Sequence, residues 1–271
     1  MTNFGAIFGD RKALIAMAHV PALPGTPLYD ASLGMQGIID VVSRDVEILT
    51  QAGFDAVMFC NENDRPYELR AAPFSAAAMA RVVATVAAEV LPAGAPFGAD
   101  FLWDSECAFA VAAATGASFM RTTATGVWES DMGLWQTDAA KLLRDRRQFD
   151  VENLAVLMNI TPEFASPIGG RRPAEIARSV AVSSLADAIL VSGPMAGAEP
   201  DEHTLQDVRS AVPDETPVLL NTGARAETIA DHLKVVDGCI VGSSLKVGGH
   251  TWNPVDPDRA RRFIDAARQV G

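Results

Sequence analysis

Cysteine and histidine are scarce in this sequence, and their spacing does not match the common zinc sites. The three cysteines, Cys60, Cys107 and Cys239, form no CxxC pair. The four histidines form no HxH or HxxxH pair, so a zinc site is not expected. Unpaired thiols are typical of a reducing compartment, and we expect small buried side chains here rather than disulfides or nucleophiles.

The sequence also lacks the features of exported, membrane and nucleic-acid-binding proteins. No basic segment followed by a cleavable apolar stretch stands near the N-terminus, and the apolar run at residues 13–20 is far shorter than the roughly 20 residues of a membrane span. The 34 acidic and 22 basic side chains give a net charge of −12, and no basic patch offsets it. We therefore expect a cytoplasmic protein with no membrane insertion and no nucleic acid partner.

No low-complexity linker or charge block divides the chain, so residues 1–271 are predicted to form a single domain. Short apolar runs alternate with longer segments of helical periodicity, which is typical of βα units around a parallel sheet. Eight strands are predicted, at Ala13–His19, Ala56–Cys60, Pro96–Asp100, Phe119–Thr122, Leu154–Asn159, Ala188–Val191, Val218–Asn221 and Gly238–Val241. An open doubly wound sheet has the same alternation, but no GxGxxG follows the first strand. The prediction is an α/β fold of the (β/α)8, or TIM barrel, type, for which about 250 residues are usual.

The last two predicted strands both end in small residues that favour anion binding. Backbone N–H groups, hydroxyls and an ammonium group at such turns can surround a phosphate, and TIM barrels commonly bind phosphate after strands 7 and 8. The predicted phosphate ligands are Gly223, Gly242, Ser243, Ser244 and Lys246. For Lys246, an exposed lysine in a loop is an equally good interpretation.

Polar side chains end most of the other predicted strands, where a barrel places its catalytic groups. The candidate catalytic residues are His19, Glu62, Asp100 and Arg121, and the candidate substrate-binding residues are Asn61, Asp64, Asn159, Ser192 and Asn221. Each has a structural alternative: His19 could bond a neighbouring loop, Glu62 or Asp64 could cap a helix or bind Arg65, and Arg121 could pair with Asp100 inside the barrel. No certain cofactor follows from the sequence, although Glu62, Asp64 or Asp100 could hold Mg²⁺. Since no lysine lies within an inner strand, a Schiff-base aldolase is disfavoured.

Three predicted connections are long enough to cover a site or shape an interface, at about residues 21–34, 124–138 and 161–172. Trp103, Trp128 and Trp135 lie in or near such connections, either as core residues or as part of a lid or subunit contact. A homo-oligomer is expected, because barrels often associate through their outer helices and loops.

Along nearly its whole length the chain resembles the BtpA/SgcQ family. The resemblance lies in His19 with Pro21–Gly25, in Asn61–Asp64, Gly98–Asp104 and Phe119–Arg121, and above all in Ile240–Lys246 continuing to Trp252–Pro257. It implies a (β/α)8 barrel similar to the ribulose-phosphate-binding barrels, but no settled reaction, since some members are labelled as assembly factors and others accompany sugar-uptake genes. The chain departs from the family pattern at Asp100 and Asp104, and at Asn221-Thr222-Gly223 where Gly-Ser-Gly is common.

The leading hypothesis is an enzyme that isomerises, epimerises or cleaves a small phosphorylated sugar or related phosphorylated metabolite. In it, Asp100 is the general base and His19 its acid partner, while Arg121 with Asn61 or Asn159 stabilises a developing enolate. Two alternatives remain open at this point. One is a non-catalytic metabolite-binding or assembly factor of the BtpA type. The other is hydrolysis of a nucleoside or glycosidic bond by Glu62 and Asp100, which would have to face each other.

Overall fold

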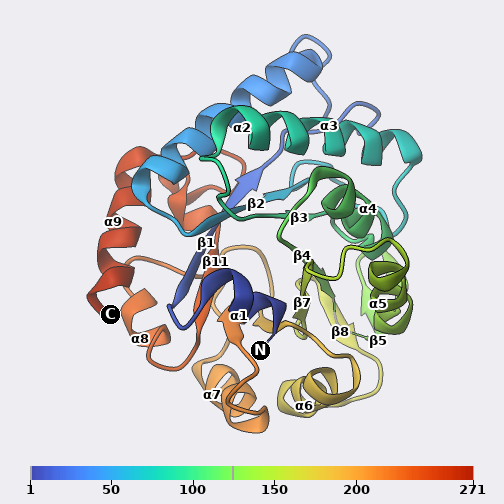
Figure 1. Ribbon diagram of the computed structural model, residues 1–271, viewed down its shortest axis with the longest axis vertical. Helices are drawn as coiled ribbons and strands as arrows, with labels where there is room; N and C mark the ends of the chain where they lie inside the picture. The colour runs from blue at the N-terminus through green and yellow to red at the C-terminus, as the bar shows by residue number, and fades with distance from the viewer. Residues whose placement is uncertain (1, 124, 271) are drawn as a thin grey trace.

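The computed structural model describes residues 2–123 and 125–270, and its centre is a closed barrel of eight parallel strands in the order β1-β11-β10-β9-β7-β4-β3-β2 (Figure 1). The strands are β1 (Ala13–His19), β2 (Ala56–Cys60), β3 (Phe97–Asp100), β4 (Phe119–Thr123), β7 (Ala155–Asn159), β9 (Ala188–Val191), β10 (Val218–Leu220) and β11 (Gly238–Val241). The predicted TIM barrel is confirmed, and every predicted strand is present with bounds that differ by one residue at most.

Helices pack around the outside of the barrel, except for α1, which lies across one end. They are α1 (Asn3–Phe8), α2 (Gly34–Ala52), α3 (Pro73–Val90), α4 (Ser105–Thr115), α5 (Ala139–Gln148), α6 (Pro173–Ser183), α7 (Glu202–Ala211), α8 (Ile229–His232) and α9 (Pro257–Ala267). The apolar stripe of α2, which includes Val42, Val46 and Leu49, is fully buried against the strands. At the start of α9, the Asp256 side chain caps the helix by accepting hydrogen bonds from the backbone N–H groups of Asp258 and Arg259.

The amino-terminal end of the barrel is closed by α1, which lies across the opening in Figure 1. Phe8 of this helix packs against Phe119 at the start of β4, with ring centroids 5.8 Å apart. Because α1 covers this end, we expect a ligand site at the carboxyl-terminal ends of the strands.

The connections after β4 and β7 form a second, three-stranded antiparallel sheet that the sequence did not predict. Its strands are β5 (Gly126–Ser130), β6 (Gly133–Thr137) and β8 (Ala165–Pro167), in the order β6-β5-β8. Trp128 and Trp135 are paired across β5 and β6 and are both buried, so they are core residues rather than a mobile lid. This sheet therefore fixes the two long connections beside the barrel opening.

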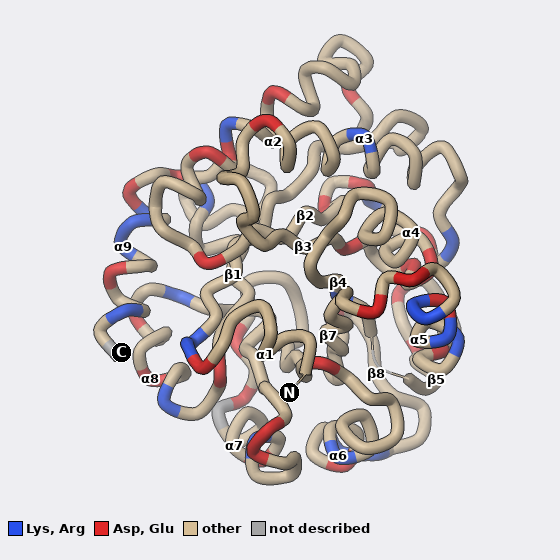
Figure 2. The backbone as a smooth tube through the Cα atoms, viewed as in Figure 1, with Lys and Arg blue, Asp and Glu red and all other residues tan. Residues whose placement is uncertain are grey.

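Within the described residues, one helix, α3, is long and apolar enough to cross a membrane by length and composition. In the fold it is an outer barrel helix, packed between α2 and α4 with Met79, Val82 and Val86 fully buried. Figure 2 shows acidic and basic residues interspersed over the outer helices, with few charges on α3. The three cysteines are buried and unpaired, as expected.

Candidate functional site

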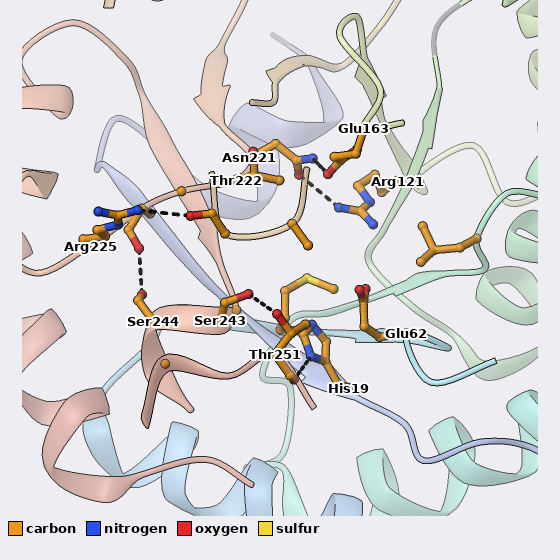
Figure 3. Close-up of a pocket in the computed structure, with 18 of the residues that line it drawn as sticks. His19, Glu62, Arg121, Glu163, Asn221, Thr222, Arg225, Ser243, Ser244 and Thr251 are labelled. Carbon is orange, nitrogen blue, oxygen red and sulfur yellow. Dashed lines mark hydrogen bonds between the residues drawn. The ribbon is translucent and has the colours of Figure 1, made fainter. Parts of the chain in front are cut away.

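A cavity of about 360 Å³ opens at the carboxyl-terminal ends of the barrel strands. This volume lies in the range of about 300–1,000 Å³ that is usual for small-molecule sites. Figure 3 shows its labelled side chains in two groups: Arg225, Ser243 and Ser244 on one side, and Glu62, Arg121 and Glu163 on the other. His19 lies below the space between them and Asn221 above it. We call this space the mouth cavity.

The turns after β10 and β11 make one end of the mouth cavity suited to an anion. Gly223 and Ala224 follow β10, and Gly242, Ser243 and Ser244 follow β11; all five line the cavity. In the described part of the chain, the backbone N–H groups of Gly223, Ala224, Ser243 and Ser244 donate to no protein acceptor. Arg225 lies beside Ser244 at the same end, and Nη1 of Arg259 donates to the backbone oxygen of Ser244 at 3.2 Å. Unpaired N–H groups next to arginines form a phosphate-binding arrangement.

Lys246 does not belong to this anion-binding end, and its prediction as a phosphate ligand is wrong. Its side chain is 1% exposed, so it is not a solvated loop lysine either. Its Nζ lies 2.9 Å from Oδ2 of Asp45 in α2, where the two form a buried ion pair. Burial lowers the pKa of Lys246, and the attraction of Asp45 opposes that effect. The pair anchors the segment after β11 to α2.

His19, at the end of β1, lines the mouth cavity as predicted, but in its neutral form. Its Nδ1 lies 3.1 Å from the backbone carbonyl oxygen of Thr251. Burial, followed by the positive charges of Lys246 and Arg121, lowers the pKa of His19 to about 3. A neutral imidazole that donates through Nδ1 has only a lone pair at Nε2, so His19 is an acceptor there. It cannot be the predicted acid partner at neutral pH.

Arg121 lines the cavity from β4 and binds Asp100 at the end of β3. Nε of Arg121 lies 2.8 Å from Oδ2 of Asp100, and Nη2 contacts the same oxygen. Burial alone would lower the pKa of Arg121, but the negative charges of Asp100 and Glu163 outweigh that effect and raise it. The guanidinium group therefore stays charged. Asp100 is 4% exposed and lies behind Arg121, away from the mouth cavity. The structure thus contradicts Asp100 as general base, and as the partner of Glu62 in a glycosidase pair.

Glu62, after β2, is the predicted carboxyl group that does face the mouth cavity. Burial raises the pKa of Glu62 to about 7, although the nearby charge of Arg121 lowers it. The hydroxyl of Tyr67 lies 3.0 Å from the backbone oxygen of Glu62 and 3.3 Å from its Oε1. A carboxyl group with a pKa near 7 is suited to both taking and giving a proton at physiological pH.

Glu163 is a second carboxyl group of the cavity, and the sequence analysis missed it. It lies in the connection after β7, four residues beyond Asn159, where its Oε2 accepts a hydrogen bond of 3.1 Å from Nδ2 of Asn159. Burial raises the pKa of Glu163, and Arg121 opposes the shift. Its place in a long connection after a barrel strand was the available signal. Thr251, Arg225 and Arg259 were also missed, because they lie beyond the turns that contain the glycine and serine residues.

Two predicted binding residues, Asn159 and Ser192, contact residues of the cavity lining instead of lining it themselves. Oγ of Ser192 accepts hydrogen bonds from Nδ2 of Asn159 at 2.9 Å and from Nδ2 of Asn221 at 2.8 Å. Asn221 itself lines the cavity, and its Oδ1 accepts a bond of 3.3 Å from Arg121. Asn159 and Ser192 therefore hold Glu163 and Asn221 in place, and of the three amide and hydroxyl side chains only Asn221 lines the cavity.

The predicted pair Asn61 and Asp64 has a structural role. Oδ1 of Asn61 accepts a hydrogen bond from the N–H of Leu102, and its Nδ2 donates to Asp64. Asp64 also accepts from the N–H of Leu23. These bonds connect the segments after β1, β2 and β3, and neither side chain lines the mouth cavity. The prediction that they bind substrate is not supported.

The residues proposed for Mg²⁺ do not converge on one point. Glu62 faces the cavity, Asp64 binds the segment after β1, and Asp100 binds Arg121. Within residues 2–123 and 125–270, no group of three or more His, Cys, Asp or Glu side chains is placed to hold a metal ion. A Mg²⁺ ion held by these three carboxylates stays a prediction without support from their geometry.

Comparisons with known proteins agree with this architecture. The model of the BtpA family matches residues 10–269. The sgc region protein SgcQ of Escherichia coli is 38% identical, with 97% of each chain covered, and the photosystem I biogenesis protein BtpA of Synechocystis sp. is 30% identical, with 96% of this chain and 89% of that protein covered. Among solved structures, tryptophan synthase of Mycobacterium tuberculosis matches with a TM-score of 0.63 and 98% of each chain covered. At 14% identity, that likeness concerns the fold alone.

Proposed function

The chain belongs to the BtpA family, and from this premise we propose that it is an enzyme acting on a small phosphorylated sugar or related phosphorylated metabolite. The reaction is a proton transfer next to a carbonyl group, of the isomerase, epimerase or lyase type. The observation that carries the proposal is the content of one cavity: anion-binding turns at one end, and Glu62 with Arg121 at the other.

The residues divide the chemistry between them. Gly223, Gly242, Ser243 and Ser244, with Arg225, bind the phosphate, and its binding energy holds the reacting carbon near Glu62. The ionised form of Glu62 removes a proton from the carbon next to the carbonyl group, and the electron pair moves onto the carbonyl oxygen.

Arg121 stabilises the negative charge that develops on that oxygen, because Asp100 holds its guanidinium in place. Nε2 of His19 accepts a hydrogen bond from a substrate hydroxyl and orients it. In an isomerase the proton on Glu62 then passes to the former carbonyl carbon while the neighbouring hydroxyl proton moves to the former carbonyl oxygen, and in a lyase it passes to the leaving fragment. In an epimerase the original carbon must be protonated on its opposite face.

Ligand-induced thermal stabilisation is the first test. Purified protein is heated with ribose 5-phosphate, ribulose 5-phosphate, fructose 6-phosphate or inorganic phosphate, each compared with the unphosphorylated sugar. A ligand at 100 times its dissociation constant stabilises by about 2.7 kcal/mol. We expect stabilisation by phosphate esters that is absent in Ser243→Asp and retained in Ser210→Asp, which adds the same charge on the exposed side of α7. Equal stabilisation by the unphosphorylated sugars would contradict the proposal.

Deuterium exchange tests the chemical step. For each ester that binds, incubation in D2O and proton NMR measure exchange of the hydrogen next to the carbonyl group. We expect exchange with the wild-type protein and a loss of about 10²–10⁴-fold in Glu62→Gln, the usual contribution of a general acid–base group. Binding without exchange for every ester would leave a metabolite-binding protein.

An assembly role is the second candidate, because the relative BtpA is by its name a photosystem I biogenesis protein. A stable stoichiometric protein partner, together with no phosphate-ester binding, would favour that role. A cytoplasmic location and a homo-oligomeric state are further predictions, tested by fractionation of the source cells and by light scattering during gel filtration.

A further inference from the structure

The strand order of the barrel places an apolar wall directly across the mouth cavity from the anion-binding turns. In the closed order β1-β11-β10-β9-β7-β4-β3-β2, strand β3 is four positions from β10 and therefore opposite it. The turn after β10 carries Gly223, and the segment after β3 carries Leu102 and Trp103, which line the same cavity. A ligand that binds through a phosphate at β10 thus extends toward β3.

Four side chains make up what we call the apolar wall: Tyr67, Leu102, Trp103 and Phe164. The Trp103 ring packs edge-on against Tyr67, with centroids 6.4 Å apart, and against buried Trp135 at 5.3 Å. Leu102 and Trp103 are almost completely buried, while Phe164 at the rim is 39% exposed. Trp103 is therefore fixed by its neighbours, and Phe164 presents an apolar ring to the opening.

Two polar groups near this wall are already engaged, and a third, the indole N–H of Trp103, has no partner among the described residues but is itself inaccessible to solvent. The Tyr67 hydroxyl contacts Glu62, and the N–H of Leu102 donates to Asn61. A bare sugar phosphate would place hydroxyl groups against the wall and would lose hydrogen bonds to water there without replacement. A flat apolar ring would instead bury apolar surface and stack on aromatic side chains.

From this arrangement we infer that the substrate is a phosphate ester whose far end carries a planar apolar ring, rather than a bare sugar phosphate. The inference rests on the proposed function, since it takes the phosphate to bind at β10 and β11. Glu62, after β2, and Arg121, on β4, flank the segment after β3 that carries Leu102 and Trp103, so the reacting atoms belong to the part of the substrate next to the ring.

Matched ligands test the inference by isothermal titration calorimetry. Ribose 5-phosphate is compared with adenosine 5′-monophosphate and uridine 5′-monophosphate, which add a ring to the same sugar phosphate, and with phenyl phosphate, which has the ring without the sugar. We expect at least one ring-bearing ester to bind about tenfold or more tightly than ribose 5-phosphate, as base stacking on aromatic side chains gives in other proteins.

Two variants connect that difference to the apolar wall. Phe164→Ala removes the exposed ring at the rim and is expected to reduce the preference for ring-bearing esters by about three- to tenfold, with the affinity for ribose 5-phosphate unchanged. Phe149→Ala, which removes a 62% exposed ring outside the mouth cavity, is the control and leaves both affinities unchanged. A Trp103→Phe variant is expected to lose the tryptophan fluorescence quenching that ring-bearing esters cause.

The outcomes separate the inference from the proposed function. If ribose 5-phosphate binds at least as tightly as all three ring-bearing esters, the inference is wrong and the proposed function stands. If Phe164→Ala weakens all esters equally, the wall has a structural role only and the inference is again wrong. If none of the four phosphate esters binds, the proposed function fails, and the inference fails with it.

Discussion

Nδ1 of His19 lies 3.1 Å from the backbone carbonyl oxygen of Thr251, and this contact fixes which ring nitrogen carries the proton. A carbonyl oxygen only accepts hydrogen bonds, so Nδ1 is the protonated nitrogen and Nε2 is free to accept. The hydroxyl of Thr251 also lies 2.7 Å from Oγ of Ser243. One residue thus joins the anion-binding turn after β11 to the imidazole at the end of β1.

His19 is predicted to remain neutral throughout the physiological pH range. Its pKa is lowered to about 3, chiefly by burial, so the Nε2 nitrogen-15 NMR signal of His19 is expected not to titrate between pH 5 and 8. The folded-state pKa of His19 lies below its unfolded value of about 6.5. The contribution of neutral His19 to the free energy of unfolding is therefore fully present above pH 6.5 and is lost as pH falls toward 3.

Urea unfolding of the wild type and of His19→Gln between pH 7 and pH 4 measures that loss. Below pH 6, the wild type is expected to lose up to about 1.4 kcal/mol per pH unit more than the variant. A His19 signal that titrates near pH 6.5 would show that the imidazole is solvated, contrary to the hydrogen bond and burial seen here.

Glu62 is predicted to affect stability in the opposite direction. Burial raises its pKa to about 7 from the usual 4.5, so its stabilisation is fully present below pH 4.5 and is lost as pH rises through 7. Glu62→Gln cannot ionise and is expected to gain stability relative to the wild type as pH rises from 5 to 8. Thermal unfolding of both proteins at several pH values measures the difference, and a constant difference would mean that Glu62 ionises normally.

The barrel was predictable from sequence because its strands are buried on both faces. Each appears as a short apolar run with little alternation, as β1 and β11 do. The small sheet of β5, β6 and β8 was not predictable in the same way. β5 has one buried residue, Trp128, among exposed and half-buried neighbours, so its apolar pattern is too weak to distinguish from a loop.

The candidate site was predictable only as a set of strand ends. Position along the chain indicated that His19, Glu62, Arg121 and Asn221 lie at the barrel opening, and all four line the mouth cavity. It could not indicate which carboxyl group is free, since the Asp100 partner comes from the neighbouring strand β4. Nor could it place Lys246, whose partner Asp45 lies 201 positions away. Pairings between distant residues depend on the packed fold.

The ion pair of Lys246 and Asp45 is predicted to be structural. Removing one charge leaves the other buried and unpaired, so Lys246→Met is expected to cost about 3–5 kcal/mol of unfolding free energy. The double variant Lys246→Met/Asp45→Asn removes both charges and keeps an oxygen for the N–H of Val255, which Asp45 binds at 2.9 Å. It is expected to recover more than half of the loss and to bind phosphate esters like the wild type. Weak ester binding by a stable double variant would restore Lys246 as a phosphate ligand.

Gly223 is predicted to be irreplaceable at the anion-binding turn for two separate reasons. Its φ of +79° is unfavourable for other residues, and a β-carbon there would lie 2.4 Å from the backbone N and Cα of Glu199. Gly116, with a φ of +73° and no atom within 4 Å of such a β-carbon, isolates the first reason. Gly116→Ala is therefore expected to cost about 1–2 kcal/mol from the left-handed conformation alone.

Gly223→Ala must also displace the segment around Glu199, which contacts the anion-binding end. Gly197 of that segment lies so close to Ser243 that a β-carbon on Gly197 would be 3.3 Å from its Oγ. We expect Gly223→Ala to be less stable than Gly116→Ala and to bind ribose 5-phosphate at least about tenfold more weakly, a loss of about 1.4 kcal/mol. Chemical unfolding and calorimetry of both variants measure the two effects. Equal stability and unchanged affinity would mean that the turn after β10 does not bind the phosphate.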